Sequence, residues 1–306
     1  MIGYLESMLL IAGIFALLAQ GLNLHWGFTG LLNFGHVAFF AVGAYTMGIL
    51  KTQFDVPLLP SFLAAMVAST LLGVIVALPA IRLRADYLAI VTITIGEIFR
   101  LILKSAPGVT DYTRGPRGIR GFSNEFYFFR DDIGLGFLSP DQYLMLVVWT
   151  TVAIVGLLLW VLIKSPWGRV LKGIREDEDA VRALGKNVTA YKLQSFALGA
   201  AIGGLAGVYF AMSIGSLAPD TYLPIITFQA WTIMMLGGSA SHWGPVVGSI
   251  IFWAIFNGTL YIPREFLSGA EAAYLRQIGI GALIMAIMIF RPQGILGNRE
   301  EMVLDR

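Results

Sequence analysis

The sequence predicts an all-α polytopic membrane protein with about nine transmembrane helices, within a range of roughly 8 to 10. Of its 306 residues, 57% are hydrophobic and only 13% are charged, about half of the roughly 25% charged residues of a soluble globular protein. The mean hydropathy is +0.75, and a single soluble core of this length cannot bury so much apolar surface. A soluble enzyme is therefore excluded.

Nine apolar segments are candidates for crossing the hydrocarbon, which takes about 20 mostly apolar residues in a helix. In order they are Tyr4 to Leu24, Gly30 to Leu50, Pro60 to Ile81, Tyr87 to Lys104, Tyr143 to Ile163, Leu193 to Gly215, Ile225 to Leu236, Pro245 to Tyr261 and Leu275 to Phe290. The seventh is short and runs into Gly237-Gly238-Ser239-Ala240-Ser241. A broken helix is one interpretation of this segment, and it requires protein or a cavity to shield the backbone.

The loops between these segments differ in charge, and the difference predicts the orientation. Loop 164–192 is strongly basic, whereas the arginines of loop 105–142 are balanced by five acids. Basic residues concentrate on the cytoplasmic side of short loops, so 164–192 is expected in the cytoplasm and 105–142 outside it. Alternation across nine spans then puts the N-terminus outside and the C-terminus in the cytoplasm. Residues 1–306 are expected to form a single transmembrane domain.

Several kinds of chemistry have no signature in the sequence. A Gly-x-x-x-x-Gly-Lys-Ser/Thr loop is absent, so we expect no nucleotide bound in the P-loop manner. His25, His36 and His242 lack the His-x-x-x-His spacing of a helical metal site, and there is no cysteine. We therefore expect no catalytic residue, no metal and no cofactor in this chain. With 21 basic and 19 acidic residues, a nucleic-acid partner is not expected either.

Loop 164–192 contains an amphipathic segment that is expected to form a short helix from Arg175 to Gly185. Four apolar residues follow a 7, 3, 4 spacing that gives one helical stripe; they are Ile174, Val181, Leu184 and Val188. Acidic residues near its start suit the helix dipole, and Gly185 is a plausible stop. Such a helix is shaped to dock into a groove of a soluble partner. The alternative is a solvated, basic loop.

The segment Gly173 to Gly185, followed by Tyr191-Lys192-Leu193, resembles the cytoplasmic loop of the LivM-type permeases of branched-chain amino acid ABC importers. The resemblance extends, in family order, over Gly27 to Tyr45, Arg82 to Thr92, Gly96 to Arg100, Thr113 to Ile119, Leu236 to Gly248 and Arg291 to Leu296. Two departures stand out. Arg114 occupies a position where the family usually has Gly, and Ser239-Ala240-Ser241 replaces a more Gly-rich turn.

The resemblance implies one of two transmembrane subunits of an importer in the bacterial inner membrane. Its partners would be a second, related permease in a heterodimer, two ABC ATPases that carry ATP and Mg, and a periplasmic substrate-binding protein. The cargo would be branched-chain or other neutral amino acids moved by alternating access, or alternatively urea or a similar small polar solute. The residues expected to couple to the ATPase are Arg175, Glu176, Asp177, Glu178, Ala180, Val181, Leu184 and Gly185.

Polar residues inside the spans are the candidates for the substrate path. Glu97 and Arg100 are three residues apart, so they share a helical face and can pair. Each would cost about 3 kcal/mol facing lipid at the bilayer centre, so both are expected to face protein or water. Two roles are open for this pair: Glu97 and Arg100 line the substrate path, or they hold neighbouring helices together. In a secondary transporter or channel, the alternative of a different class, they would serve an ion or proton pathway.

Two further sets of residues are expected to act between helices. Asn33 and His36 should lie on one face of the second span, where hydrogen bonding to another helix is favoured over a role in the substrate path. Gly199, Gly203 and Gly207 recur every four residues. This spacing predicts a helix face that a neighbouring backbone approaches closely.

Overall fold

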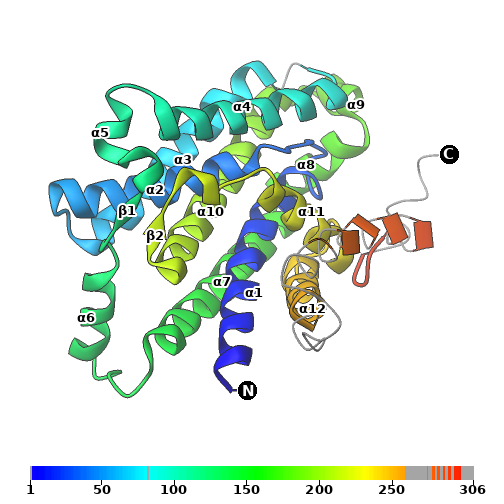
Figure 1. The fold of residues 1–306 in the computed structure, drawn as a ribbon. Helices are drawn as coiled ribbons and strands as arrows, with labels where there is room; N and C mark the ends of the chain where they lie inside the picture. Colours follow the sequence, from blue (N-terminus) through cyan, green and yellow to red (C-terminus); the bar gives the residue numbers. More distant parts are fainter. Residues whose placement is uncertain are drawn as a thin grey trace.

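The computed structural model describes residues 2–80, 83–258, 274, 278–279, 281–282, 285–286, 289–290 and 293–297. This part of the chain is almost wholly helical (Figure 1). The helices are α1 (Ile2–His25), α2 (His36–Phe54), α3 (Leu58–Ala80), α4 (Ala85–Ser105), α5 (Val109–Thr113), α6 (Asn124–Asp132), α7 (Pro140–Lys164), α8 (Pro166–Glu176), α9 (Glu178–Ala183), α10 (Val188–Ile214), α11 (Ile225–Gly237) and α12 (Gly244–Gly258). Two 3-10 turns, η1 (Gly115–Arg117) and η2 (Pro219–Thr221), and two strands, β1 (Ile119–Arg120) and β2 (Ser216–Leu217), complete the description.

Four of these helices, α1, α3, α7 and α10, are long and apolar enough to cross a membrane. Helix α4 carries four charged residues, which lower its apolar character. Of the nine expected spans, the first seven each coincide with a helix, and α12 covers the eighth as far as residue 258. Half of the ninth, Leu275 to Phe290, lies outside the described residues, as does most of the tail. The total number of spans therefore stays a prediction.

Helix α10 is the central element, and it packs against α1, α2 and α3. Its glycines make this packing close. A Cβ at Gly199 would come within 2.6 Å of the carbonyl oxygen of Gly21 in α1, and one at Gly207 would overlap the carbonyl of Phe40 in α2. The backbones of α1 and α2 therefore approach the backbone of α10 closely (Figure 1).

The second helix begins later than its hydropathy predicts. The expectation of a helix from Gly30 is wrong, because residues 26–35 form a turn and an extended segment before α2 starts at His36. Gly30 has φ +75°, which is a left-handed conformation that glycine adopts easily and that ends regular helix. A Cβ at Gly35 would overlap the backbone of Thr92 in α4. Apolar side chains in this segment thus pack the interior without being helical.

The seventh and eighth segments form a tight helical hairpin around the glycine-rich turn. Helix α11 has 13 residues and a length of about 20 Å, which is too short for a core about 30 Å thick. Gly237 abuts Gly244, and Gly248 abuts Ile233, so the two helices run back along each other. The turn is fastened to α1, because Asn23 Oδ1 accepts from the Ala240 amide at 2.9 Å and its Nδ2 donates to the Ser241 carbonyl at 3.0 Å.

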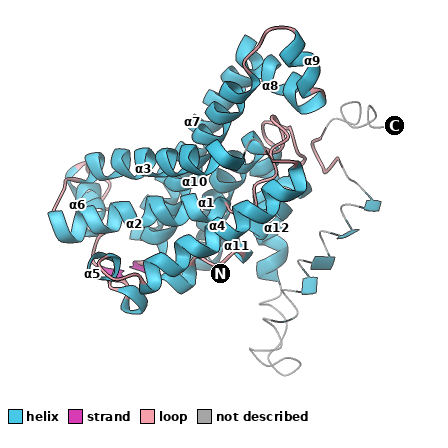
Figure 2. Cartoon of the chain, turned by 90° about the horizontal axis from the view of Figure 1, so that it is seen from above, coloured by secondary structure: helices cyan, strands magenta, loops and turns pink. Residues whose placement is uncertain are grey.

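The segment 164–187 forms two helices rather than the single helix expected over Arg175 to Gly185. Asp177 is extended, with φ −151° and ψ 103°, and separates α8 from α9. Its carboxylate accepts from the Asp179 and Ala180 amides at 2.9 and 3.0 Å, a preferred role for aspartate at a helix start. We call α8 and α9 the lobe. It lies at the far end of α7 and projects beyond the other helices (Figure 2).

The loop 105–142 is tied to the segment between α10 and α11. Strand β1 pairs with β2 in antiparallel register, with Ile119 opposite Leu217 and Arg120 opposite Ser216. Both apolar partners, Ile119 and Leu217, are fully buried. This pairing holds the turn η2, which follows β2, beside the C-terminal part of α4.

Candidate functional site

Glu97 and Arg100 lie on one face of α4 and pair with each other. Arg100 Nε donates to Glu97 Oε2 at 2.9 Å, and Arg100 Nη2 donates to Glu97 Oε1 at 2.5 Å. The contact is therefore a two-pronged one, the geometry that a planar guanidinium offers a carboxylate. The guanidinium side is largely buried, since 12% of the Arg100 side chain is exposed against 39% of that of Glu97.

Two further charged residues, which the sequence analysis did not single out, join this pair. Arg100 Nη1 donates to Asp220 Oδ1 at 2.6 Å, and Lys104 Nζ donates to both Asp220 oxygens at 2.8 Å. The hydrogen bond from Lys104 holds the pKa of Asp220 below its usual range. We call Glu97, Arg100, Lys104 and Asp220 the charge cluster.

The charge cluster balances two carboxylates with two cations and connects two elements. Arg100 and Lys104 are four residues apart, so two like charges share one face of α4. This spacing in the sequence could have indicated that an acidic residue from another element pairs with them. Asp220 is this acidic residue. It belongs to η2 and pairs with Arg100 and Lys104 near the C-terminal end of α4, which leads into loop 105–142. Glu97 and Asp220 remain partly exposed, so the cluster is accessible from outside the chain.

Asn33 and His36 lie together, although not on one helix as expected, because Asn33 belongs to the extended segment before α2. Asn33 Nδ2 is 3.1 Å from His25 Nδ1 and 3.4 Å from His36 Nδ1, and His25 Nε2 is 3.0 Å from the Phe196 carbonyl. All three side chains are fully buried. In this conformation they connect α1, the segment 26–35 and α10, and His25 is the member that the sequence analysis missed.

The glycine stripe of α10 makes room for this polar group. A Cβ at Gly199 would overlap the His25 ring, and one at Gly203 would come within 3.0 Å of His36 Nε2. Side chains at these two positions would displace the imidazoles. Within the described part of the chain, no group of three or more His, Asp or Glu side chains is placed to hold a metal ion.

The residues expected to couple to an ATPase divide into an inward and an outward set. Val181 packs in an apolar cluster with Leu171 and Ile174, and Arg175 Nη1 donates to the Gly27 carbonyl at 2.5 Å. Glu178 forms ion pairs with Arg182, at 2.8 Å, and with Lys192. The outward set consists of Glu176, Asp177, Ala180, Leu184 and Gly185, all of which are exposed.

Leu184 is the most distinctive residue of the outward set. It ends α9 with 79% of its surface exposed, whereas Val181, three residues earlier, is 8% exposed. Val181 is among the residues expected to couple to an ATPase, but its contacts in this structure lie within the chain, so its part in that coupling stays a prediction. Leu184 remains as an apolar side chain presented by a folded lobe.

Comparison with known proteins agrees with this architecture. A family model described as branched-chain amino acid transport system / permease component matches residues 4–288. The high-affinity branched-chain amino acid transport system permease protein LivM of Salmonella typhimurium is 31% identical over 301 residues, which cover 92% of this chain and 68% of that protein.

Two more distant relatives extend the comparison. A probable LivM of Methanocaldococcus jannaschii is 25% identical, covering 97% of this chain and 94% of that protein. The LivH permease of Escherichia coli is 22% identical, covering 95% and 93%. Because the family model spans nearly the whole chain and LivM proteins match it over almost all of its length, this chain belongs to the family of branched-chain amino acid transport permeases and is a multi-pass membrane protein.

Proposed function

We propose that this chain is one of two transmembrane subunits of an ABC importer in the bacterial inner membrane, moving branched-chain or other neutral amino acids into the cell. The observation that supports this most is the lobe, which is folded, fastened to the bundle and apolar at its outward tip. The N-terminus of the chain would lie outside the cell and its C-terminus in the cytoplasm, as the basic loop 164–192 indicates.

The proposed partners follow from what this chain lacks. ATP and Mg would be held by two ABC ATPases, because this sequence has no P-loop. The second permease would be a related chain, a proposal supported by the similarity of this sequence to both LivM and LivH proteins. A periplasmic binding protein would deliver the amino acid and supply most of the selectivity.

The charge cluster supports a neutral amino acid as cargo. Such a molecule is a zwitterion, and the cluster offers carboxylates and cations of equal number on a partly exposed face. A charged face of this kind is costly against lipid, so we infer that it faces the second permease across a water-filled path. Urea, the alternative cargo, would need hydrogen-bonding groups but no paired charges.

The same cluster argues against the secondary-transporter alternative. Glu97 is held by both prongs of Arg100, so its carboxylate already has a fixed cation as its partner within the chain and is not available to bind a transported ion. Asp220 is similarly held by Arg100 and Lys104.

Helix α10 is suited to transmitting movement between the two ends of the molecule. Its first turn carries Lys192, which pairs with Glu178 of the lobe, and its last turn leads through β2 to Asp220. It has 27 residues, about 40 Å of continuous helix. An ATPase that moves the lobe would thus shift the element that positions Asp220 against α4.

The test is to purify the tagged chain from its native membrane and identify what it retains. We expect an ATP-hydrolysing subunit and a second permease to co-purify, and the reconstituted complex to take up labelled leucine when ATP is inside. The chain alone in liposomes should neither hydrolyse ATP nor transport. Uptake of leucine by the chain alone, driven by an ion gradient, would contradict the proposal.

A further inference from the structure

A cavity of about 550 Å³ lies where four elements meet on the side of the lobe. The segment 26–35, the start of α4, the lobe and the first turns of α10 enclose it. Its lining includes four basic side chains and one carboxylate; these are Arg84, Arg175, Arg182, Lys192 and Glu178. By the charge of loop 164–192, this cavity opens at the cytoplasmic membrane surface.

The carboxylate neutralises only part of this positive charge. Glu178 pairs with both Arg182 and Lys192, and Asp179, which also contacts Arg182, is 90% exposed at its side chain and does not line the cavity. Among the described residues, none forms a hydrogen bond or ion pair with the Arg84 side chain, although its carbonyl accepts from the Leu88 amide. Basic side chains therefore outnumber carboxylates in the described lining, and the Arg84 side chain in particular offers a charge that an anion would neutralise.

The rest of the lining is apolar and continues onto the surface of α4. Leu31, Leu88 and Ile174 line the cavity together with Leu83, which is 40% exposed at its edge. Tyr87 and Ile90, four and seven residues beyond Leu83, are 61% and 60% exposed. Leu83 lies just before α4 begins, and Tyr87 and Ile90, three residues apart in the first turns of α4, share one face of that helix. An apolar track therefore leads from the edge of the cavity along the start of α4.

We propose that this cavity binds an anionic phospholipid of the cytoplasmic leaflet. The phosphate would lie among Arg84, Arg175 and Arg182, and an acyl chain would follow the track along α4. Basic pockets between transmembrane helices on the cytoplasmic side suit such head groups. A free phosphate would satisfy the charge but leave the apolar track uncovered. The bound lipid would join α4 to the lobe and so influence how the lobe moves, independently of the cargo or the direction of transport.

Native mass spectrometry tests the proposal on the full chain purified in detergent with its co-expressed partner subunits. Phosphatidylglycerol and phosphatidylcholine with identical acyl chains are titrated separately, and inorganic phosphate serves as the free anion. We expect a clear preference for phosphatidylglycerol. Arg84→Gln should weaken its binding about fivefold, the effect of one basic residue near an anionic surface, whereas Arg84→Lys should retain most of it.

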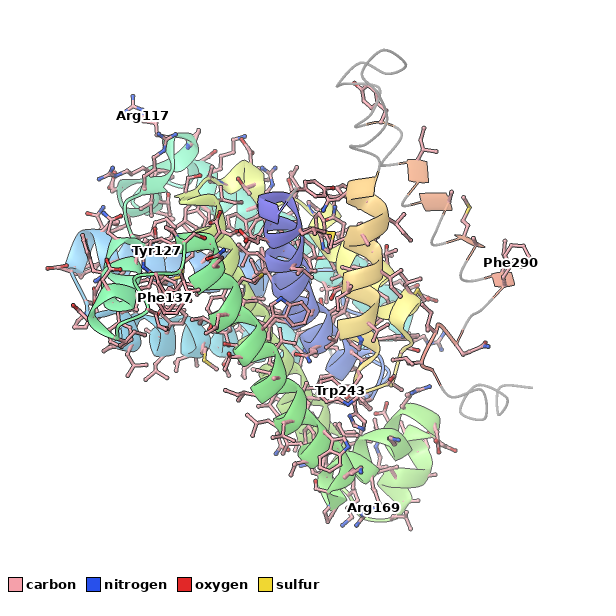
Figure 3. All side chains as sticks on the ribbon, turned by 90° about the horizontal axis from the view of Figure 1, so that it is seen from below. Arg117, Tyr127, Phe137, Arg169, Trp243 and Phe290 are labelled. Carbon is pink, nitrogen blue, oxygen red and sulfur yellow. The ribbon has the colours of Figure 1, made fainter. Side chains whose placement is uncertain are left out.

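Arg169→Gln is the matched control, because Arg169 lies on the projecting part of the lobe (Figure 3) and outside the cavity. This variant removes the same charge and should leave the preference for phosphatidylglycerol unchanged. Equal binding of the two lipids, or equal losses in Arg84→Gln and Arg169→Gln, would overturn the proposal. Displacement of phosphatidylglycerol by inorganic phosphate at equal concentration would also overturn it, because the site would then recognise a free anion.

Discussion

Arg100 is the residue on which the charge cluster depends, because it is the only one of the four that contacts both carboxylates. Its removal leaves Glu97 without its partner and Asp220 with Lys104 alone. Removal of Glu97 leaves Arg100 with Asp220. Arg100 is the most buried of the four side chains, and a charge that loses its partner in a partly buried site is costly, so the two single substitutions should not be equally harmful.

Glu97→Ala and Arg100→Ala are therefore expected to be coupled, with Arg100→Ala the more damaging. The coupling free energy should be about 1 to 3 kcal/mol, as for residues in one ionic network. Thermal unfolding of the purified complex and leucine uptake measure it in a double-mutant cycle. Arg169 and Glu176 on α8 are exposed and form the control cycle, which should be additive. Strict additivity for the α4 pair would disprove coupling.

Arg114, one of the departures from the family resemblance, adopts an unusual backbone conformation. It has φ +58°, a left-handed conformation that costs a residue with a side chain about 1 kcal/mol and costs glycine little. The glycine that the resemblance leads us to expect at this position would adopt the turn between α5 and η1 without that cost. The arginine is accommodated at some cost in stability.

Arg114→Gly is expected to raise the melting temperature of the purified complex, because it relieves about 1 kcal/mol of backbone strain. Differential scanning fluorimetry measures the change. Arg117→Gly is the control, since Arg117 is an exposed arginine of the same loop without a positive φ and projects from the molecule (Figure 3). If Arg114→Gly lowered stability as much as Arg117→Gly, the strain argument would fail.

At the scale of elements, hydropathy located most helices but not their breaks. The apolar runs of α1, α3, α7 and α10 are long enough that only a helix fits them. The break before α2 depends on a close approach of Gly35 to Thr92, a tertiary contact that no local pattern contains. The charge cluster was half predicted for the same reason, since Glu97 and Arg100 are neighbours on one helix whereas Asp220 arrives from another element.

The break at Asp177 was readable in principle. The sequence Asp177-Glu178-Asp179 has the acidic start of a helix, but the apolar spacing from Ile174 to Val188 continues through it and concealed the boundary. In the structure, Ile174 and Val181 reach the same apolar cluster from two separate helices. Periodicity thus identified Ile174, Val181 and Val188 as buried, but Leu184 of the same stripe is exposed, and the pattern did not show that these residues belong to different elements.

Asp177→Ala is expected to loosen α9, because it removes the carboxylate that accepts from two amides and costs about 1 kcal/mol. Hydrogen–deuterium exchange of the purified complex should show faster exchange over α9, with α7 unchanged. Asp177→Asn keeps a capping oxygen and should exchange like the wild type. Unchanged exchange in Asp177→Ala would mean that the cap does not hold the lobe together.

At the scale of the whole molecule, the two surfaces that we propose to be functional lie at opposite ends of α10. One is the charge cluster beside η2, and the other is the lobe (Figure 2), in which the exposed Leu184 follows α9. The lobe is internally packed through Val181 and is linked to α10 by the Glu178–Lys192 ion pair. Force applied at Leu184 would therefore be transmitted to the bundle rather than absorbed by a flexible loop.

The most direct test of this coupling is Leu184→Asp in the assembled complex, measured as substrate-stimulated ATP hydrolysis together with leucine uptake. A carboxylate in an apolar groove is costly, so both signals should be lost while membrane insertion and subunit content stay normal. Leu184→Met keeps an apolar side chain and should behave like the wild type. Wild-type hydrolysis and uptake by a fully incorporated Leu184→Asp complex would contradict the account, because the tip of the lobe would then be merely solvated.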